Sequence, residues 1–131
     1  MQPRRAPWTS ALLRERASVD PEFAVVEHDE GGLLRIAVSG EVDVATAPEL
    51  RERLYDAVDR SAGPVIADLL AVTFIDSTAL GVLIGARERS EAKGSDLRVV
   101  LKEPRLVKIF EITGLTELFS MFPSVAEAVA R

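Results

Sequence analysis

Three consecutive polar residues, Asp76-Ser77-Thr78, interrupt the apolar run from Val72 to Gly85. A hydroxyl beside a carboxylate can act as a nucleophile, cap a helix, or accept a phosphate group. The β-branched and aromatic residues before the trio indicate the end of a buried strand, whereas the spacing of Leu80, Leu83 and Ile84 after it indicates a helix. The trio is therefore predicted to lie at a strand-to-helix junction, where open α/β sheets meet ligands and partners.

Catalysis by Ser77 would require a base that takes its proton. The only histidine of the chain is His28, within the first predicted hairpin, and the G-x-S-x-G motif of serine hydrolases is absent around Ser77. Asp43 and Asp76 could form a carboxylate pair, but nothing in the sequence places a substrate pocket between them. Glycine motifs that bind phosphates or dinucleotides are also absent. We therefore predict no catalytic residues and a protein that is not an enzyme, since a small hydrolase would need His28 beside Ser77.

Two roles of the trio remain, helix capping and modification. Serine is a common N-cap, and Asp76 could serve equally well. A helix N-terminus also stabilises an added phosphate through its unpaired amides and the positive end of its dipole. Residue types alone favour capping over phosphorylation for Ser77, and they leave open which of the two residues caps the helix.

The composition excludes several other classes of protein. The chain has 131 residues, of which 47% are hydrophobic and 28% charged, as expected for one domain with its own core. It lacks cysteine and has one histidine, so we predict no disulfide, no metal site and no cofactor. The net charge of -5 argues against nucleic acid as a partner, and no apolar run approaches the ~20 residues that span a bilayer. We expect a soluble cytoplasmic protein that binds neither nucleic acid nor membrane.

The first 21 residues differ in composition from the rest of the chain. They carry four arginines, early prolines and scattered apolar residues, and they lack the apolar centre of a signal peptide. We predict a mobile N-terminal tail over residues 1–21 and a domain over residues 22–131. Trp8 stands out in this tail because an exposed tryptophan can anchor a partner, although a loosely packed or disordered tryptophan is the more ordinary interpretation.

The rest of the chain alternates between strands and helices. Gly31-Gly32 can form the tight turn of a hairpin between strands at Phe23–His28 and Leu33–Val38. Thr46 has capping-box spacing to Glu49 ahead of an amphipathic helix. We predict a single α/β domain whose mixed sheet of about five strands begins with an antiparallel hairpin and continues with alternating strands and about four helices. Later strands are predicted at Val65–Leu69, Leu97–Leu101 and within Leu115–Phe122, and later helices from Ser77, Pro104 and Val125.

Two predictions concern the surroundings of the trio. The segment from Ser39 to Val44 is predicted as a loop that carries the carboxylates Glu41 and Asp43. One side of the helix predicted from Ser77 bears mostly small residues, so another backbone could approach it closely. This backbone could belong to a neighbouring helix of the domain or to a partner, and the residue spacing is compatible with both. The residues of this small side include Thr78, Gly81, Val82 and Gly85.

Four motifs occur in order along the chain, and together they resemble one known family. They are Gly40-Glu41-Val42-Asp43, Val65-Ile66-Ala67-Asp68-Leu69, Val72 to Leu83, and Leu106 to Leu115. From about Phe23 to the C-terminus the chain resembles the STAS domain, specifically the bacterial anti-sigma factor antagonists. The resemblance implies a small α/β domain with a mixed sheet, in agreement with the predicted order of elements. One residue departs from the family motif, because Ala79 replaces the usual glycine and is expected to add a methyl group where a kinase would approach.

The resemblance also implies a function. Such antagonists bind an anti-sigma factor that is itself an ATP-bound serine kinase, and they thereby release the sigma factor. The kinase phosphorylates the serine after the motif aspartate, which is Ser77 here with Thr78 as the second choice, and a phosphatase reverses the reaction. The aspartate of the first motif, Asp43, is associated with the kinase-facing surface. The predicted partner-binding residues are Glu41, Asp43, Asp76, Ser77, Thr78 and Val82.

A phosphate on Ser77 would add a charge of about -1.5 to -2 beside Asp76, and a partner interface would have to bury that charge. Binding is then expected to fail, while the helix N-terminus tolerates the phosphate in the free domain. The alternative function is a non-phosphorylated STAS scaffold or accessory subunit of a signalling or transport complex, in which the same junction is an unmodified contact surface. We expect a monomer or a weak dimer.

Overall fold

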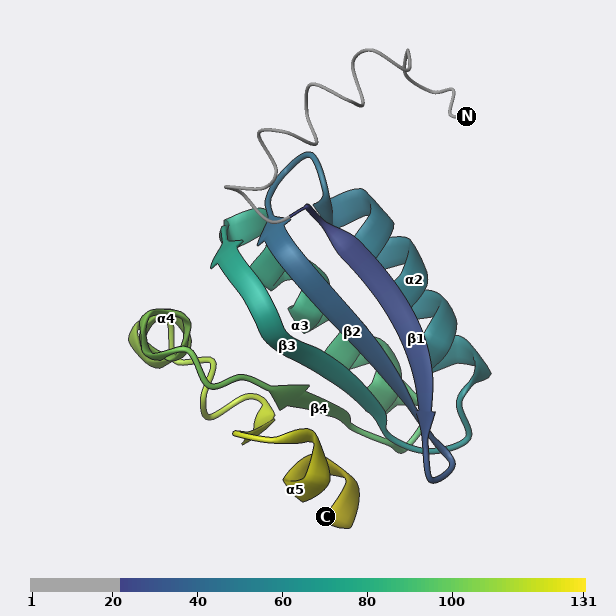
Figure 1. The fold of residues 1–131 in the computed structure, drawn as a ribbon. Helices are drawn as coiled ribbons and strands as arrows, with labels where there is room; N and C mark the ends of the chain where they lie inside the picture. Colours follow the sequence, from purple (N-terminus) through teal and green to yellow (C-terminus); the bar gives the residue numbers. More distant parts are fainter. Residues whose placement is uncertain (1–21) are drawn as a thin grey trace, which may run out of the picture.

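A computed structural model describes residues 22–131, which form a five-stranded sheet and four helices (Figure 1). The strand order follows the chain, with β1 and β2 antiparallel and the other neighbours parallel. The predicted mixed α/β sheet is therefore confirmed, whereas the predicted tail with Trp8 lies outside the described residues. The strands are β1 (Ala24–Glu30), β2 (Leu33–Val42), β3 (Val65–Ile75), β4 (Leu97–Val100) and β5 (Ser120–Phe122), and the helices are α2 (Ala47–Arg60), α3 (Ser77–Ala92), α4 (Pro104–Ile112) and α5 (Val125–Ala130).

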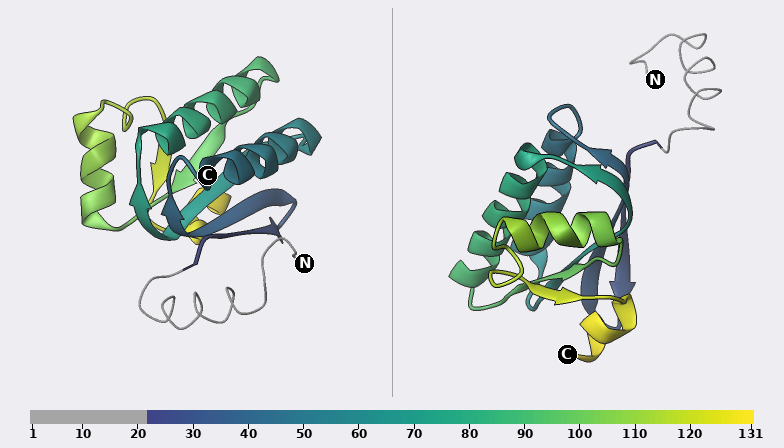
Figure 2. Two further views of the ribbon diagram at one scale, coloured as in Figure 1. Left: turned by 90° about the horizontal axis from the view of Figure 1, so that it is seen from above. Right: turned by 90° about the vertical axis from the view of Figure 1, so that its left-hand side faces the viewer.

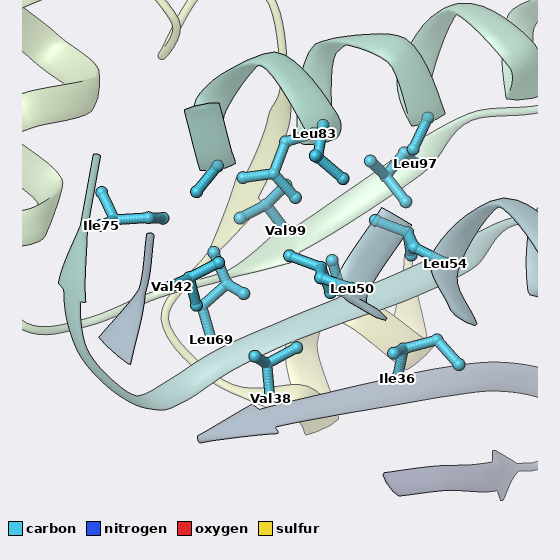
Figure 3. Close-up of a cluster of buried hydrophobic side chains, with 14 of the residues drawn as sticks. Ile36, Val38, Val42, Leu50, Leu54, Leu69, Ile75, Leu83, Leu97 and Val99 are labelled. Carbon is cyan, nitrogen blue, oxygen red and sulfur yellow. The ribbon is translucent and has the colours of Figure 1, made fainter. Parts of the chain in front are cut away.

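The helices cover the two faces of the sheet unequally (Figure 2). α2 and α3 lie side by side on one face, and the main core lies between them and the strands. Figure 3 shows this core, in which Ile36, Leu50 and Leu83 are at most 1% exposed. α5 packs near one end of the opposite face, over a smaller cluster that includes Ile66 and Phe122. α4 lies beside the sheet, and no helix of the described chain covers the rest of this opposite face along β1, β2 and β3 (Figure 1).

The hairpin between β1 and β2 has the predicted turn chemistry. Gly31 and Gly32 adopt φ angles of 64° and 97°, in the left-handed region that two-residue hairpin turns use. The Gly32 amide also donates a hydrogen bond to the Asp29 carboxylate at 2.8 Å. The first strand runs to Glu30, two residues beyond its predicted end.

The loop predicted from Ser39 to Val44 is wrong for most of its length, because β2 continues to Val42. Gly40 adopts a φ of 86° and lies so close to the Glu22 backbone that any side chain there would clash with it. The pairing of β2 with β3 shifts register on both sides of this region, so the strand passes through bulges instead of ending. Only the residues from Asp43 onward leave the sheet.

The sequence left open whether a neighbouring helix or a partner approaches the small side of α3, and the structure distinguishes two parts of this side. A side chain at Gly85 would clash with the Tyr55 hydroxyl of α2, so this part of α3 packs against the neighbouring helix. Gly81, one turn earlier, is exposed and faces open space. Close approach by a partner is therefore sterically open only near the start of α3, beside the polar trio.

α4 begins at Pro104, as predicted, and ends at Ile112, before Thr113-Gly114. Leu106 and Phe110 are buried, whereas Ile112 is 74% exposed. At 100° per residue, Ile112 stands about 200° around the helix from Phe110 and points away from the core.

Candidate functional site

The polar trio lies at the edge of the sheet where β2 and β3 end next to each other. Val42 and Ile75 are register partners at this edge, and Figure 3 shows both at the same end of the core cluster. The Asp76 amide donates a hydrogen bond to the Val42 carbonyl at 3.2 Å, so the two chain segments that leave the strands start in contact. Parallel pairing of β2 and β3 thus brings Asp43 and Asp76-Ser77 to one edge, although they are more than thirty residues apart in the sequence.

Asp76 is the residue that caps α3. Its backbone is extended, with φ -115° and ψ -176°, and its carboxylate accepts a hydrogen bond from the Ala79 amide at 3.0 Å. Its carbonyl accepts the first helical hydrogen bond, from the Leu80 amide at 3.1 Å. Of the two candidates that the sequence left open, Asp76 therefore caps the helix and Ser77 does not.

Ser77 and Thr78 open the first turn of α3 with exposed side chains. Within residues 22–131 neither hydroxyl makes a hydrogen bond to another group of the chain. A serine at the first position of a 16-residue helix faces the positive end of the helix dipole and amides that have no helical acceptor. The Ser77 hydroxyl is thus accessible, and no structural task of its own holds it in place.

Asp43 organises the turn that leads into α2. Its carboxylate accepts hydrogen bonds from the Ala45 amide at 2.9 Å and the Thr46 amide at 3.1 Å, and its carbonyl accepts one from the Ala47 amide at 2.7 Å. The Thr46 hydroxyl also lies 3.3 Å from the Asp43 carboxylate, so the turn keeps this carboxylate at the surface of the site in one orientation.

The capping box predicted between Thr46 and Glu49 is wrong. The Thr46 hydroxyl instead accepts a hydrogen bond from the Asp43 amide at 2.9 Å and donates one to the Glu41 carbonyl at 2.9 Å. The physical reason is that the chain already winds into a turn over residues 43–46, before α2 begins. Asp43, three residues before Thr46, therefore caps this turn. The signal for this was present in the sequence, because aspartate ranks above threonine as an N-cap.

Two other residues of the predicted partner surface differ in exposure. Glu41 is exposed near the end of β2, with its backbone in register with Phe74 of β3. Val82 is 7% exposed and belongs to the main core, so it offers a partner almost no surface. The small side of α3 that suggested Val82 as a contact is occupied there by the domain itself.

The expectation that Ala79 places a methyl group in the path of a kinase is wrong. Ala79 is fully buried and packs in the main core behind the trio. Its amide forms the cap with Asp76, and its side chain is buried, whereas Ser77 is exposed. The departure from the family motif therefore changes the packing under the junction and leaves its outer surface unaltered.

The sequence reasoning missed two apolar side chains at this edge. Val44, in the turn after Asp43, is 71% exposed, and Phe74, near the end of β3, is 48% exposed. Phe74 was predicted to belong to a buried strand end, but the shifts of register between β2 and β3 leave two consecutive residues, Thr73 and Phe74, outside the core. Exposed apolar groups beside carboxylates are typical of surfaces that bind proteins.

The arrangement does not support a hydrolase. His28 pairs with Arg35, seven residues before Val42 on β2, which places it about 23 Å along the strand from the Ser77 edge. Among residues 22–131, no group of three or more acidic, histidine or cysteine side chains is placed to hold a metal ion. The same part of the chain contains no helix that is long and apolar enough to traverse a bilayer.

Comparisons with known proteins point to one family. Residues 23–128 match the family model of the STAS domain. The anti-sigma-B factor antagonist of Bacillus subtilis (strain 168) is 34% identical over 88 residues, which cover 67% of this chain and 80% of that protein.

Solved structures agree with this match. An anti-sigma factor antagonist from Mycobacterium paratuberculosis superposes with a TM-score of 0.76 at 28% identity, covering 83% of this chain and 92% of that one. The Bacillus cell fate determinant SpoIIAA in its phosphorylated form superposes with a TM-score of 0.61 at 22% identity, covering 84% of this chain and 98% of that one. The second comparison is evidence of a shared fold.

Proposed function

The chain belongs to the STAS domain family, and we propose that it is an anti-sigma factor antagonist controlled by phosphorylation of Ser77. In this proposal the protein binds an anti-sigma factor that is an ATP-bound serine kinase and so releases a sigma factor. The kinase transfers a phosphate to Ser77, with Thr78 as the second choice, and a phosphatase restores binding. The protein acts in the cytoplasm by binding and not by catalysis.

One observation carries the proposal, namely that Ser77 is exposed at the start of α3 while Asp76 performs the capping. A serine that caps a helix has its hydroxyl engaged by a backbone amide, and modification would remove that hydrogen bond. Here the hydroxyl oxygen is free to accept a phosphate without the loss of a cap. The names of the relatives, which are anti-sigma factor antagonists, support the same function.

The proposed partner surface consists of Glu41, Asp43, Asp76, Ser77 and Thr78. Three of these five residues carry carboxylates, and no ion pair within residues 22–131 involves them. Such a surface fits a partner that presents basic or hydrogen-bond-donating groups. Val82, which is buried, is left out of this surface.

Phosphorylation would change binding more than folding. The phosphate adds about -1.5 to -2 charges among carboxylates that the partner must already desolvate, so the complex is weakened. In the free domain the same group lies at the positive end of the α3 dipole, where an anion is stabilised. One modification can therefore switch association while the fold is retained.

The proposal is tested by incubating the full chain with the candidate anti-sigma factor and ATP, followed by intact-mass and peptide mass spectrometry. We expect one phosphate, located at Ser77, and none in a Ser77→Ala variant. A Thr78→Ala variant is the matched control and should still gain one phosphate. Phosphate found only on Thr78, or stable binding of the anti-sigma factor with no phosphate transferred, would contradict the assignment; the second result would favour the non-phosphorylated scaffold.

A further inference from the structure

The face of the sheet opposite α2 and α3 is covered at one end only. α5 packs over Leu33, Ile66 and Phe122, and Figure 1 looks directly onto the remainder of this face along β1, β2 and β3. We call this uncovered area the open face. Its existence is not explained by the proposed function, whose residues lie along one edge of the sheet.

The open face exposes several large apolar side chains. Val26 is 48% exposed, Leu70 is 43% exposed and Phe74 is 48% exposed, and these are three of the five large hydrophobic residues that are exposed within residues 22–131. The register pairs Val26 with Ala37 of β2 and Ala37 with Asp68 of β3, two residues before Leu70. Large apolar side chains that are exposed on one uncovered face indicate a binding site for another segment.

The rim of the open face is acidic. Arg35 lies on this face, and its guanidinium is already bonded to Glu30 at 2.7 Å and to Asp68 at 2.8 Å. Glu41, near Phe74, adds a carboxylate for which the described residues supply no ion pair. Arg35 thus already pairs with Glu30 and Asp68, whereas Glu41 lies toward the other end of β2. A segment that combines apolar and basic side chains would complement this surface.

The chain enters the fold at the rim of the same face. The Glu22 backbone lies against Gly40, and Ala24 is the register partner of Ser39. The 21 residues before this point are therefore tethered beside Phe74 and Glu41. They contain the single tryptophan of the protein and two adjacent leucines, and they carry four arginines against two acidic residues: Trp8, Leu12, Leu13, Arg4, Arg5, Arg14, Arg16, Glu15 and Asp20.

We propose that residues 4–16 bind the open face of their own domain, with Trp8 and the leucines over Val26, Leu70 and Phe74 and with arginines at the acidic rim. Trp8 and Glu22 are 14 residues apart (22 - 8), which can span up to ~46 Å, whereas the seven residues of β1 extend about 23 Å. Every part of the face is thus within reach. The open face meets the proposed partner surface at Glu41 and its register partner Phe74, and the inference does not require phosphorylation.

The single tryptophan makes the proposal directly measurable in the full chain. Trp8 is the only tryptophan, so the intrinsic emission excited in the indole band reports on this residue alone. We expect the emission to be blue-shifted relative to N-acetyltryptophanamide and less readily quenched by acrylamide. Replacing Leu70 and Phe74 together by serine should lower the ratio of bound to free segment about tenfold or more, as expected for the loss of two apolar contacts.

Ile112→Ser is the matched control, because Ile112 is also exposed and apolar but lies on α4. This variant should leave Trp8 emission and quenching unchanged. Far-ultraviolet circular dichroism of all variants checks that the fold is retained, and if the double serine variant unfolds, Val26→Ser serves in its place. The proposal would be overturned if acrylamide quenched Trp8 in the unmodified chain as readily as it quenches N-acetyltryptophanamide. The proposal would also be overturned if the protection of Trp8 from quenching disappeared on dilution, because that result would indicate binding between two copies of the chain.

Discussion

The helices α2 and α3 lie side by side on the sheet, yet their two ends are held by different kinds of interaction. At the N-terminal ends, the carboxylates of Asp43 and Asp76 accept hydrogen bonds from backbone amides and from no charged group of the described chain. The Ser77 hydroxyl beside them has no partner within residues 22–131. These ends therefore keep their negative charge available to an outside group.

At the C-terminal ends, charged side chains bind each other and the helix carbonyls. Arg89 of α3 pairs with Asp59 of α2 at 2.6 Å, and this hydrogen bond lowers the pKa of the Asp59 carboxyl. The Lys93 ammonium donates to the carbonyls of Val58 at 2.6 Å, Asp59 at 2.9 Å and Ser61 at 2.7 Å. A cation is favourable at the negative end of a helix dipole, so Lys93 both caps α2 and ties it to α3.

If Ser77 is the switch that we propose, the contrast separates the ends that anchor the helices from the ends that signal. The C-terminal ends fix the two helices to each other through contacts that are complete within the domain. The N-terminal ends are shaped by short local hydrogen bonds, and a new charge there changes what the surface can bind while the anchored ends hold the helices in place.

The sharpest test of this contrast places the same charge at each end. Ser77→Asp should weaken binding of the anti-sigma factor about 100-fold or more, because a further carboxylate must be desolvated in the interface. Ala62→Asp adds an equal charge in the exposed loop after α2 and should alter binding by less than about twofold. Isothermal titration calorimetry measures both. Equal losses for the two variants would show that net charge, and not position, governs the complex.

Removal of the lysine at the anchored end should affect stability and leave binding intact. Lys93→Met deletes three hydrogen bonds to carbonyls, and we expect the free energy of unfolding to fall by about 1–2 kcal/mol. Lys108→Met, at an exposed position of α4, is the control and should change stability by at most about 0.5 kcal/mol. Urea unfolding followed by circular dichroism gives both values. A Lys93 variant as stable as its control would refute the anchoring role.

At the N-terminal end of α3, we expect loss of the cap to reduce stability by less than the Lys93 substitution does. The loss should depend on Asp76 and not on Ser77. Asp76→Ala removes the hydrogen bond to the Ala79 amide and should lower the free energy of unfolding by about 1 kcal/mol. Asp76→Asn should retain most of this stability, because asparagine is also a good N-cap. Ser77→Ala should lie within about 0.5 kcal/mol of the unmodified protein. A larger loss for Ser77→Ala than for Asp76→Ala would reverse the assignment of the cap.

The smallest effect concerns pH at the anchored end. The hydrogen bond from Arg89 holds the pKa of Asp59 below its ordinary value of 3.8. Because the folded pKa is the lower one, this pair contributes stability above pH 3.8 and loses it as the pH falls through the folded pKa. Carbon-13 NMR titration of the Asp59 carboxyl should give a midpoint below 3.8, and Arg89→Gln should raise it. A midpoint that does not respond to Arg89→Gln would exclude the hydrogen bond as the cause.

Much of the fold follows from the sequence because it rests on patterns that repeat. Alternating strands and helices predicted the parallel part of the sheet, and Gly31-Gly32 predicted its hairpin. The same alternation predicted that Asp76 and Ser77 lie at a strand-to-helix junction. These features depend on the average properties of whole segments, and tertiary contacts reinforce them.

The errors occur where one tertiary contact decides a local conformation. β2 continues through Gly40 because its pairing with β3 tolerates bulges, which no local pattern reveals. The turn after β2 is capped by Asp43 and not by Thr46, since the chain winds one turn earlier than the helix itself. Ala79 points into the core because its position relative to the junction is set by the packing of α3 on the sheet. Sequence spacing alone does not fix such orientations.

The order of the strands has a consequence for how the protein is made. Each strand pairs with the one that precedes it in the chain, and none has to insert between two earlier strands. Pairing between sequence neighbours closes shorter connections than a strand order that joins distant segments would, which favours faster folding. Because synthesis proceeds from the N-terminus, the sheet can grow by addition at one edge as the chain leaves the ribosome. The Ser77 junction is built from β2, β3 and α3, so all of its parts precede β4 in the chain.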